Sequence, residues 1–296
     1  MYITYSCDSA YLLVKALKRN VPIISMSHTS PEFDYLNVFG VYLGNYENYK
    51  EAVDLLRHKR MERQLDVYRQ TVSKVSAIQV LMPEFVPQMQ AMYPGVRVVC
   101  IPNSVTQFQE PASLENRVII NVARLVPIKR QQLIVLAFNL LKDRFPDWTI
   151  EIWGQDKGDK YSQELKRLIY KLDLNNKVKI CGVTSNIEEQ LKRSAVFLMT
   201  SSVEGFCLGM VEAMAKGVPP IGCKTCSAIN SIIRHGKNGL LCDETPEAIA
   251  GALATLMSDI NLRKRLGSSA RNDAKTYAPQ RIRNQWEALL MSLTNS

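Results

Sequence analysis

Short apolar runs alternate along most of the chain with segments whose hydrophobic residues recur at helical spacing. The short runs are rich in β-branched residues and predict strands. They cover residues 1–6, 22–27, 77–82, 96–101, 117–123, 148–154, 177–182, 195–201, 218–222 and 239–242. Helices are predicted over 9–19, 47–73, 83–92, 130–144, 161–173, 186–193, 208–216, 245–257 and 260–275. This alternation is typical of parallel sheets with crossover helices, so we expect a doubly wound α/β fold.

A polar segment, residues 102–117, follows neither period and separates the first four predicted strands from the last six. We therefore expect two domains, residues 1–108 and 109–296, with a terminal helix that packs back on the first domain. A length of 296 residues agrees with this, since one domain takes ~150 residues. Ligands of open parallel sheets bind where strands end and loops enter helices, so site residues are sought there.

The loop and helix after the strand 195–201 read SVEGFCLGMVEAMAKG. Gly205 and Gly209 allow the backbone to approach a ligand closely, and the first-turn amides of the helix are unpaired, which suits a diphosphate. Glu204 and Glu212 are good acceptors for vicinal sugar hydroxyls. The alternative is plainer: Glu204 is an acidic charge at a helix N-terminus, and Glu212 lies on a solvated helix face.

A second loop, in the segment NVARLVPIKRQQLIVLAF (121–138), carries Arg124 and Lys129 between a strand and an amphipathic helix. Two cations at one strand end can converge on a phosphate group, the arginine with its planar fork and the lysine as a point charge.

With these loops in place, the segment 117–277 resembles the nucleotide-sugar-binding domain of retaining glycosyltransferases of family 4, which have two facing Rossmann-like domains (the GT-B fold). The matching pieces are NVARLVPIKRQQLIVLAF, IEIWGQD, VKICGVTSNIEEQLKRSAVFLMTSSVEGFCLGMVEAMAKGVPPIG and IIRHGKNGLLC.

This resemblance implies transfer of a sugar from a nucleoside diphosphate sugar to an acceptor hydroxyl with retained configuration, in glycan, polysaccharide or glycolipid synthesis. Arg124 and Lys129 would contact the diphosphate, Glu204 would face the transferred sugar, and Glu212 would bind the ribose. The implied donor-binding residues are Arg124, Lys129, Val183, Thr184, Glu204, Gly205, Phe206, Cys207, Leu208, Gly209 and Glu212, with Val183 and Thr184 beside the base.

The first part resembles the acceptor-side domain of the same family. KRNVPIISMSHTSPE is similar to the stretch whose histidine approaches the donor sugar, which implies a catalytic role for His28 beside Glu204, Arg124 and Lys129. A histidine after a strand is otherwise often a hydrogen-bonded structural residue. The segment 100–105 looks like the end of that domain.

The chain departs from the family pattern in three places. Cys207 stands where glycine is usual, and Ser231 where glutamate is common. The family's first strand and glycine-rich loop have no counterpart, so we expect an N-terminal domain that is incomplete at its start.

Composition and cysteine content indicate the class of protein and its cellular location. Hydrophobic residues make up 46% and charged residues 22% of the chain, as in globular proteins. No secretory signal and no membrane-spanning run is readable, and the seven cysteines are odd in number and scattered. These features predict a cytoplasmic location with reduced thiols. Cys223 and Cys226 form a C-x-x-C, but no second pair or nearby histidine completes a metal site, so we expect none.

The net charge of +9 bears on which molecules the protein binds. The basic segment 57–63 predicts either docking of a peripheral protein to an anionic membrane surface or only a solvated helix face. Nucleic-acid binding is not expected, because no recognised module accompanies the charge. The expected small-molecule partner is a UDP-sugar or GDP-sugar that needs no metal, with a glycan or lipid-linked acceptor.

Two other classes of function share parts of this pattern. A non-catalytic partner or remnant would keep the donor-binding fold without transfer. An NAD-type dehydrogenase is disfavoured, because no G-x-G-x-x-G follows a first strand.

Overall fold

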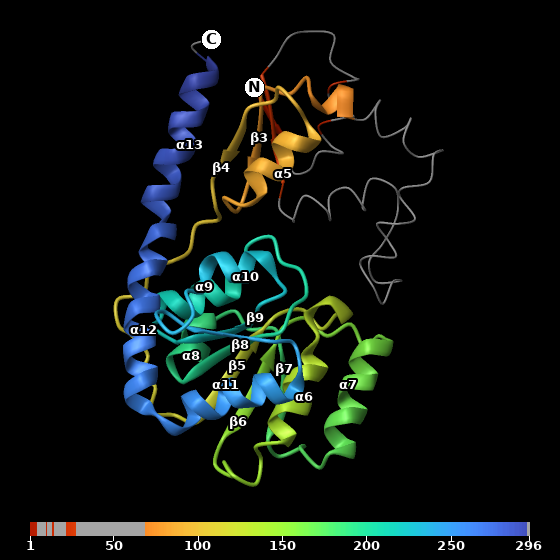
Figure 1. Cartoon of the computed structure of the whole chain (residues 1–296), viewed down its shortest axis with the longest axis vertical. Helices are drawn as coiled ribbons and strands as arrows, with labels where there is room; N and C mark the ends of the chain where they lie inside the picture. The colour runs from red at the N-terminus through yellow and green to blue at the C-terminus, as the bar shows by residue number, and fades with distance from the viewer. Residues whose placement is uncertain (5–9, 11–13, 15–21, 28–68, 295–296) are drawn as a thin grey trace. The chain divides into compact units, whose positions relative to one another are not determined.

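The structure, a computed structural model, describes residues 1–4, 10, 14, 22–27 and 69–294 (Figure 1). In this part of the chain, all the predicted strands form, and they build one four-stranded and one six-stranded sheet. Every strand pairing in both sheets is parallel. The predicted α/β class with two parallel sheets is therefore confirmed.

The chain divides into two compact units. The first comprises residues 1–103 and 280–296, and the second comprises residues 104–279. The sequence placed the division after residue 108, whereas the structure divides the chain after Asn103.

The first unit has the strand order β1-β2-β3-β4. Its described elements are β1 (Tyr2–Thr4), β2 (Ile23–Met26), β3 (Ala77–Val80), α5 (Phe85–Met92), β4 (Val98–Cys100) and most of α13 (Pro279–Thr294). Ile282 and Leu289 of α13 lie in one buried cluster with Ile24, Ala77 and Ile101 of the sheet region. The last helix of the chain therefore completes the core of the unit in which the chain begins.

The second unit carries the loops of interest. Its elements are β5 (Val118–Val122), η2 (Pro127–Lys129), α6 (Gln131–Asn139), β6 (Thr149–Trp153), α7 (Lys160–Lys171), β7 (Val178–Gly182), α8 (Ile187–Lys192), β8 (Val196–Met199), α9 (Leu208–Ala215), β9 (Pro220–Cys223), α10 (Ser227–Ile232), β10 (Leu240–Cys242), α11 (Pro246–Ser258), α12 (Ile260–Ala274) and η3 (Lys275–Tyr277).

The strand order of this sheet is β10-β9-β8-β5-β6-β7. The chain starts at β5, proceeds outward to β6 and β7, and then returns to β8 on the other side of β5. The direction of winding therefore reverses between β5 and β8. In open α/β sheets, this reversal leaves a crevice at the carboxyl ends of the two strands, which is where ligands bind.

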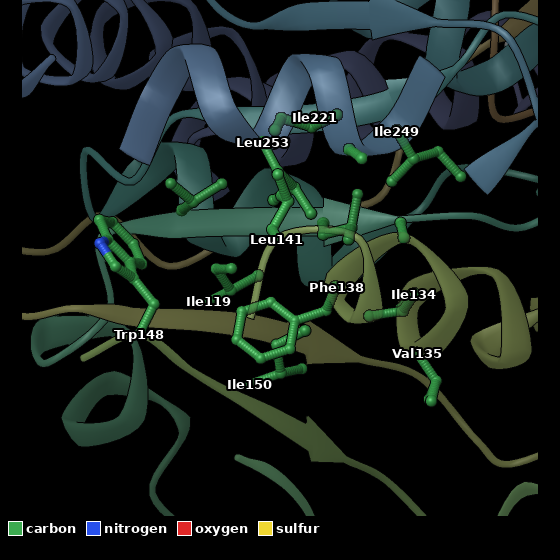
Figure 2. Packing of buried hydrophobic residues seen from close by; sticks show 14 of the residues in the cluster. Ile119, Ile134, Val135, Phe138, Leu141, Trp148, Ile150, Ile221, Ile249 and Leu253 are labelled. Carbon is green, nitrogen blue, oxygen red and sulfur yellow. The ribbon is translucent and has the colours of Figure 1, made fainter. Parts of the chain in front are cut away.

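A large hydrophobic core fixes the strands that carry these loops. Phe138 of α6, Leu253 of α11 and Ile119 and Ile150 of the sheet belong to one buried cluster (Figure 2). Each of these side chains is fully buried, and burial of one such side chain contributes about 1.5–3 kcal/mol. Helices α9 and α10 lie on the other side of the same sheet (Figure 1).

One predicted helix is shorter in the structure, and one helix of the structure was not predicted. The helix predicted over 130–144 ends at Asn139, and its continuation is a turn in which Leu141 N donates to Phe138 O at 2.8 Å. Helix α10 was not predicted, and α13 lies after the last periodic segment, where the sequence analysis expects a terminal helix. Most residues of the predicted helices 9–19 and 47–73 lie outside the described part of the chain.

Candidate functional site

The candidate residues of the second unit lie where the strand order reverses. Arg124 and Lys129 follow β5, and Glu204 follows β8, the strand hydrogen-bonded to β5. The sequence alone could not show that these two loops are neighbours, because β6 and β7 come between the two strands along the chain.

Hydrogen bonds at Gln131 fix the conformation of the loop after β5. The Gln131 side chain, which is fully buried, donates from Nε2 to the carbonyl oxygen of Arg124 at 2.9 Å. The backbone N of Gln131 donates to the hydroxyl of Tyr161 at 2.8 Å. Burial raises the pKa of Tyr161 to about 12, so this hydroxyl stays protonated at any ordinary pH. Gln131 and Tyr161 are thus site-shaping residues that the sequence patterns did not single out.

The same loop also rests on the loop after β6. Gly154 has a φ of +150°, and a side chain there would overlap the carbonyl oxygen of Ala123. Two backbone hydrogen bonds cross at this point, Ala123 N to Trp153 O at 2.9 Å and Leu125 N to Gln155 O at 3.0 Å. The backbone on both sides of Arg124 along the chain is therefore fixed by β6 and the loop that follows it.

Lys129 and Glu204 are brought together. The ammonium Nζ lies 2.6 Å from Oε1 of Glu204, and the two side chains are 16% and 11% exposed. The loop from β8 also binds the backbone beside the lysine, because Ser202 N donates to Ile128 O at 3.0 Å. The Thr200 hydroxyl lies 2.9 Å from the carbonyl oxygen of Lys129. The lysine is thus fixed by backbone contacts and by a charge pair.

The two predicted phosphate-binding cations differ in their surroundings. Lys129 is already paired with a carboxylate. The Arg124 side chain is exposed, and it forms no hydrogen bond or ion pair within the described part of the chain. A ligand anion could thus bind Arg124 directly. At Lys129, the anion would bind beside the Glu204 carboxylate or displace it from the ammonium group.

Helix α9 begins without a side-chain cap. Its N-cap residue, Cys207, has a left-handed backbone with φ 57° and ψ 58°. Gly209, in the first turn, packs so closely on the end of β5 that a Cβ atom would lie 3.1 Å from Val122 Cβ. The uncapped first-turn amides are the groups that an anion could bind. The close approach that Gly209 permits is to β5, which brings these amides to the Arg124 loop.

Other predicted residues around this helix differ in exposure. The Phe206 ring is buried and stacks edge-on against Tyr277 with centroids 5.1 Å apart, so this side chain anchors the loop. Gly205 is half-buried and has no positive φ. Leu208 is 45% exposed at the first helical position. Of these residues, only the backbone of the loop and the Leu208 side chain are available to a ligand.

Glu212 lies on α9 with its carboxyl group half-buried. Burial raises its pKa above the ordinary value. In the residues described, no hydrogen bond or ion pair satisfies this carboxyl group. A solvated surface carboxylate would not be desolvated in this way, so the plain reading as a solvated helix face is disfavoured.

The loop after β7 carries Val183 and Thr184. The Val183 side chain is 75% exposed. The Thr184 hydroxyl accepts a hydrogen bond from Asn186 N at 3.0 Å and helps to start α8. The loop therefore presents one exposed apolar side chain at the edge of the sheet, next to the end of β6.

The cysteine pair that forms the C-x-x-C is not a bonded pair. The Cys223 thiol hydrogen-bonds to Cys242, its partner across β9 and β10, and this contact and burial raise the pKa of Cys223. Burial also raises the pKa of Cys226, to about 11. Among the described residues, no group of three His, Cys, Asp or Glu side chains could hold a metal ion. A reaction without a metal stays a prediction.

Besides Gln131 and Tyr161, three further features of the site were not found from the sequence: the left-handed Arg130, its ion pair with Glu244, and a hydrogen bond from Thr225 to the same carboxylate. No local pattern signals a pair between residues so far apart along the chain. His28 and the basic segment 57–63 lie outside the described residues.

Comparison with known proteins identifies the family. A family model described as "Glycosyl transferases group 1" matches residues 103–273. The chain belongs to this family. A curated relative, an exopolysaccharide phosphotransferase of Streptomyces coelicolor, is 32% identical over 202 residues, which cover 67% of this chain and 21% of the relative. An uncharacterized glycosyltransferase of Haemophilus influenzae is 25% identical over 190 residues, 64% of this chain and 53% of that protein. The chain thus spans about half or less of the length of these relatives.

Solved structures of GT-B glycosyltransferases share the fold. Staphylococcus aureus TarM, crystallised with fondaparinux, α-GlcNAc-glycerol and UDP, matches with a TM-score of 0.77 at 19% identity, over 97% of this chain and 54% of that one. Anabaena HepE, in complex with UDP and glucose, matches with a TM-score of 0.76 at 20% identity, over 98% and 78% of the two chains. Within the described residues, no helix is long and apolar enough to span a membrane.

Proposed function

We propose that this chain carries the donor site of a retaining glycosyltransferase, which moves a sugar from a nucleoside diphosphate sugar to an acceptor hydroxyl in glycan or polysaccharide synthesis. The observation that carries the proposal is the meeting of three groups at the strand reversal. These are Arg124, which has no partner in the described part of the chain, the paired Lys129–Glu204 and the uncapped start of α9.

The proposed reaction depends on stabilising the negative charge of the leaving group. When a glycosidic bond to a diphosphate breaks, the leaving group gains negative charge. Arg124, Lys129 and the amides of α9 would bind this group and stabilise the charge as it develops. One contact of this type is commonly worth about 3 kcal/mol in the transition state. In this scheme, the protein's cations take the role that a metal ion has in other transferases.

The remaining residues have roles on either side of the diphosphate. Glu204, which holds Lys129 at 2.6 Å, would face the transferred sugar. Glu212 would accept hydrogen bonds from the ribose, and Val183 with Thr184 would border the base. The proposal gains support from the family and from two neighbours of the same fold that bind UDP. UDP-sugars and GDP-sugars are the donors proposed.

The cytoplasm is the proposed location, and a peripheral position at a membrane surface would bring a lipid-linked acceptor to the site.

His28 is proposed to approach the donor sugar.

Binding of nucleotides and nucleosides tests the proposal. Arg124→Ala and Lys129→Ala should each weaken the affinity for UDP or GDP by about 100-fold or more, with little change for uridine or guanosine. Arg167→Ala removes an exposed arginine of α7 and serves as the matched control. Calorimetric titration measures all four ligands. Equal losses for nucleotide and nucleoside would refute the diphosphate assignment. Nucleotide binding without donor hydrolysis or transfer would favour the alternative, a non-catalytic partner or remnant.

A further inference from the structure

Arg130 has an unusual backbone for its type. It directly follows Lys129, ends η2 and begins α6, and it has a φ of 50° and a ψ of 40°. Side chains with a Cβ atom avoid this left-handed region, which glycine adopts without steric cost. Sites that keep such strain are often functional, because the surrounding structure must hold them in place.

Contacts of the Arg130 side chain hold its backbone in this conformation. Its Nη1 pairs with Oε2 of Glu244, and the two side chains are 31% and 36% exposed. The same Oε2 accepts a hydrogen bond from the Thr225 hydroxyl at 2.9 Å. We call Arg130, Glu244 and Thr225 the Arg130 clasp. It joins the loop after β5 to the connections that follow β9 and β10.

Those two connections are themselves tied together. Lys224 Nζ pairs with Asp243 Oδ1 at 3.1 Å, and Lys224 N donates to Cys242 O at 2.9 Å. Glu244 therefore extends from an anchored loop and can fix the arginine that it binds.

The clasp and the end of β8 hold the lysine loop from the same side of β5, because β8, β9 and β10 follow one another on that side of the sheet. The Thr200 hydroxyl lies 2.9 Å from the carbonyl oxygen of Lys129 and 3.0 Å from that of Arg130. The backbone at these two residues is thus held from β8, and the direction of the chain after Lys129 is held from β10 through Glu244. Neither contact uses the Lys129 ammonium, which leaves it to Glu204 and to a ligand.

We propose that the Arg130 clasp positions Lys129 for the donor diphosphate and does not itself touch the ligand. This inference rests on the proposed function. A purely structural role would not need an arginine here, because glycine would relieve the backbone strain. The arginine is explained if its pair with Glu244 fixes the orientation of the lysine loop.

Two substitutions at Arg130 separate backbone from side chain. Arg130→Gly removes both the strain and the ion pair, whereas Arg130→Ala removes the pair and keeps the strain. The melting temperature should therefore be unchanged or raised in the glycine variant and lowered in the alanine variant. The ratio of UDP affinity to uridine affinity should fall about tenfold in both, a size usual for coupled side chains. Glu244→Gln should lower this ratio in the same direction, and the double variant Arg130→Gly/Glu244→Gln should be no worse than Arg130→Gly.

Calorimetric titration and thermal unfolding of the full chain measure these effects, with Lys129→Ala beside them. If Lys129→Ala lowers the ratio and Arg130→Gly does not, the clasp proposal is wrong and the diphosphate site stands. If the Arg130 variants weaken UDP and uridine equally, the role is structural and the proposal is also wrong. If Lys129→Ala leaves the ratio unchanged, the diphosphate assignment fails and the clasp proposal with it.

Discussion

Lys129 and Glu204 form a charge pair in which both groups have proposed ligand contacts. Their 2.6 Å separation and low exposure make it a strong contact in the ligand-free protein. A diphosphate that approaches Lys129 brings a second anion to the same ammonium. The carboxylate of Glu204 therefore opposes nucleotide binding electrostatically, even while it orients the lysine.

Glu204→Gln should separate binding from transfer. Removal of the negative charge leaves Lys129 free for phosphate, so UDP affinity should be unchanged or higher, whereas sugar transfer or donor hydrolysis should fall about 100-fold. Stability should fall by about 1–2 kcal/mol, because a hydrogen bond between charged groups is weakened. Calorimetry for UDP and a turnover assay for the donor measure the two effects. A parallel loss in both would reassign Glu204 to a structural role.

Glu212 should make both stability and ribose recognition depend on pH. Because burial raises its pKa in the folded state, the folded protein binds more protons than the unfolded chain between the ordinary value of 4.5 and the raised value. The stability contributed by this group is therefore present at low pH and is lost as pH rises through that window.

Glu212→Gln should remove this pH dependence and should stabilise the protein at neutral pH. It should also bring the affinities for UDP and 2′-deoxy-UDP closer together, because a carboxylate accepts two hydroxyl hydrogen bonds and an amide oxygen accepts them less strongly. Thermal unfolding against pH and paired titrations provide the measurements. Glu164→Gln on the exposed face of α7 is the control, and identical behaviour of the two variants would contradict the ribose assignment.

At the scale of elements, the start of α9 depends on its contact with β5. A side chain at Gly209 would meet Val122 Cβ and its carbonyl oxygen, each at 3.1 Å, closer than ordinary van der Waals contact. At Gly251 in α11, by contrast, nothing lies within 4 Å of an added Cβ. Both glycines lie in helices, so an alanine at either position gains the same helix propensity.

Gly209→Ala and Gly251→Ala should therefore act in opposite directions. Alanine at 251 should stabilise the protein by about 0.5–1 kcal/mol. Alanine at 209 should push α9 away from β5, cancel that gain and weaken UDP binding. Denaturant unfolding and calorimetry of both variants measure this. Wild-type UDP affinity in the Gly209→Ala variant would show that the amides of α9 do not hold the diphosphate.

Elements could be predicted from the sequence where a local pattern determines them. The strands are β-branched runs between turn residues, and within the described residues a strand forms in each predicted run, including the six of the second sheet. Helix α10 was missed because it is short, and its six residues SAINSI carry no clear period.

The candidate site was predictable only in part. The loops after β5 and β8 carry recognisable residues, but their pairing depends on strand order, which no local pattern contains. The backbone of Arg130 and Cys207 is left-handed, and neither is a residue that favours such a conformation. The Arg130–Glu244 pair joins residues far apart along the chain and was missed for the same reason as the strand order.

At the scale of the whole molecule, the proposed nucleotide contacts all come from the second unit, residues 104–279. Each unit has its own buried cluster. Proteins with several such units often unfold in more than one step. A ligand stabilises only the unit that holds its site, by about 2.7 kcal/mol at 100 times its dissociation constant.

UDP should therefore raise the temperature of one unfolding transition and leave that of the other unchanged. Two matched substitutions show which unit each transition belongs to. Phe138→Ala removes a fully buried ring from the core of the second unit, and Phe85→Ala removes a ring that is 1% exposed in the first unit. Each should cost about 3–5 kcal/mol in its own unit. In calorimetric scans, the transition that UDP raises should be the one that Phe138→Ala lowers, and the transition that Phe85→Ala lowers should not respond to UDP. If UDP instead raises the transition that Phe85→Ala lowers, nucleotide contacts from the first unit would be required, and the placement of the nucleotide contacts wholly in the second unit would be wrong.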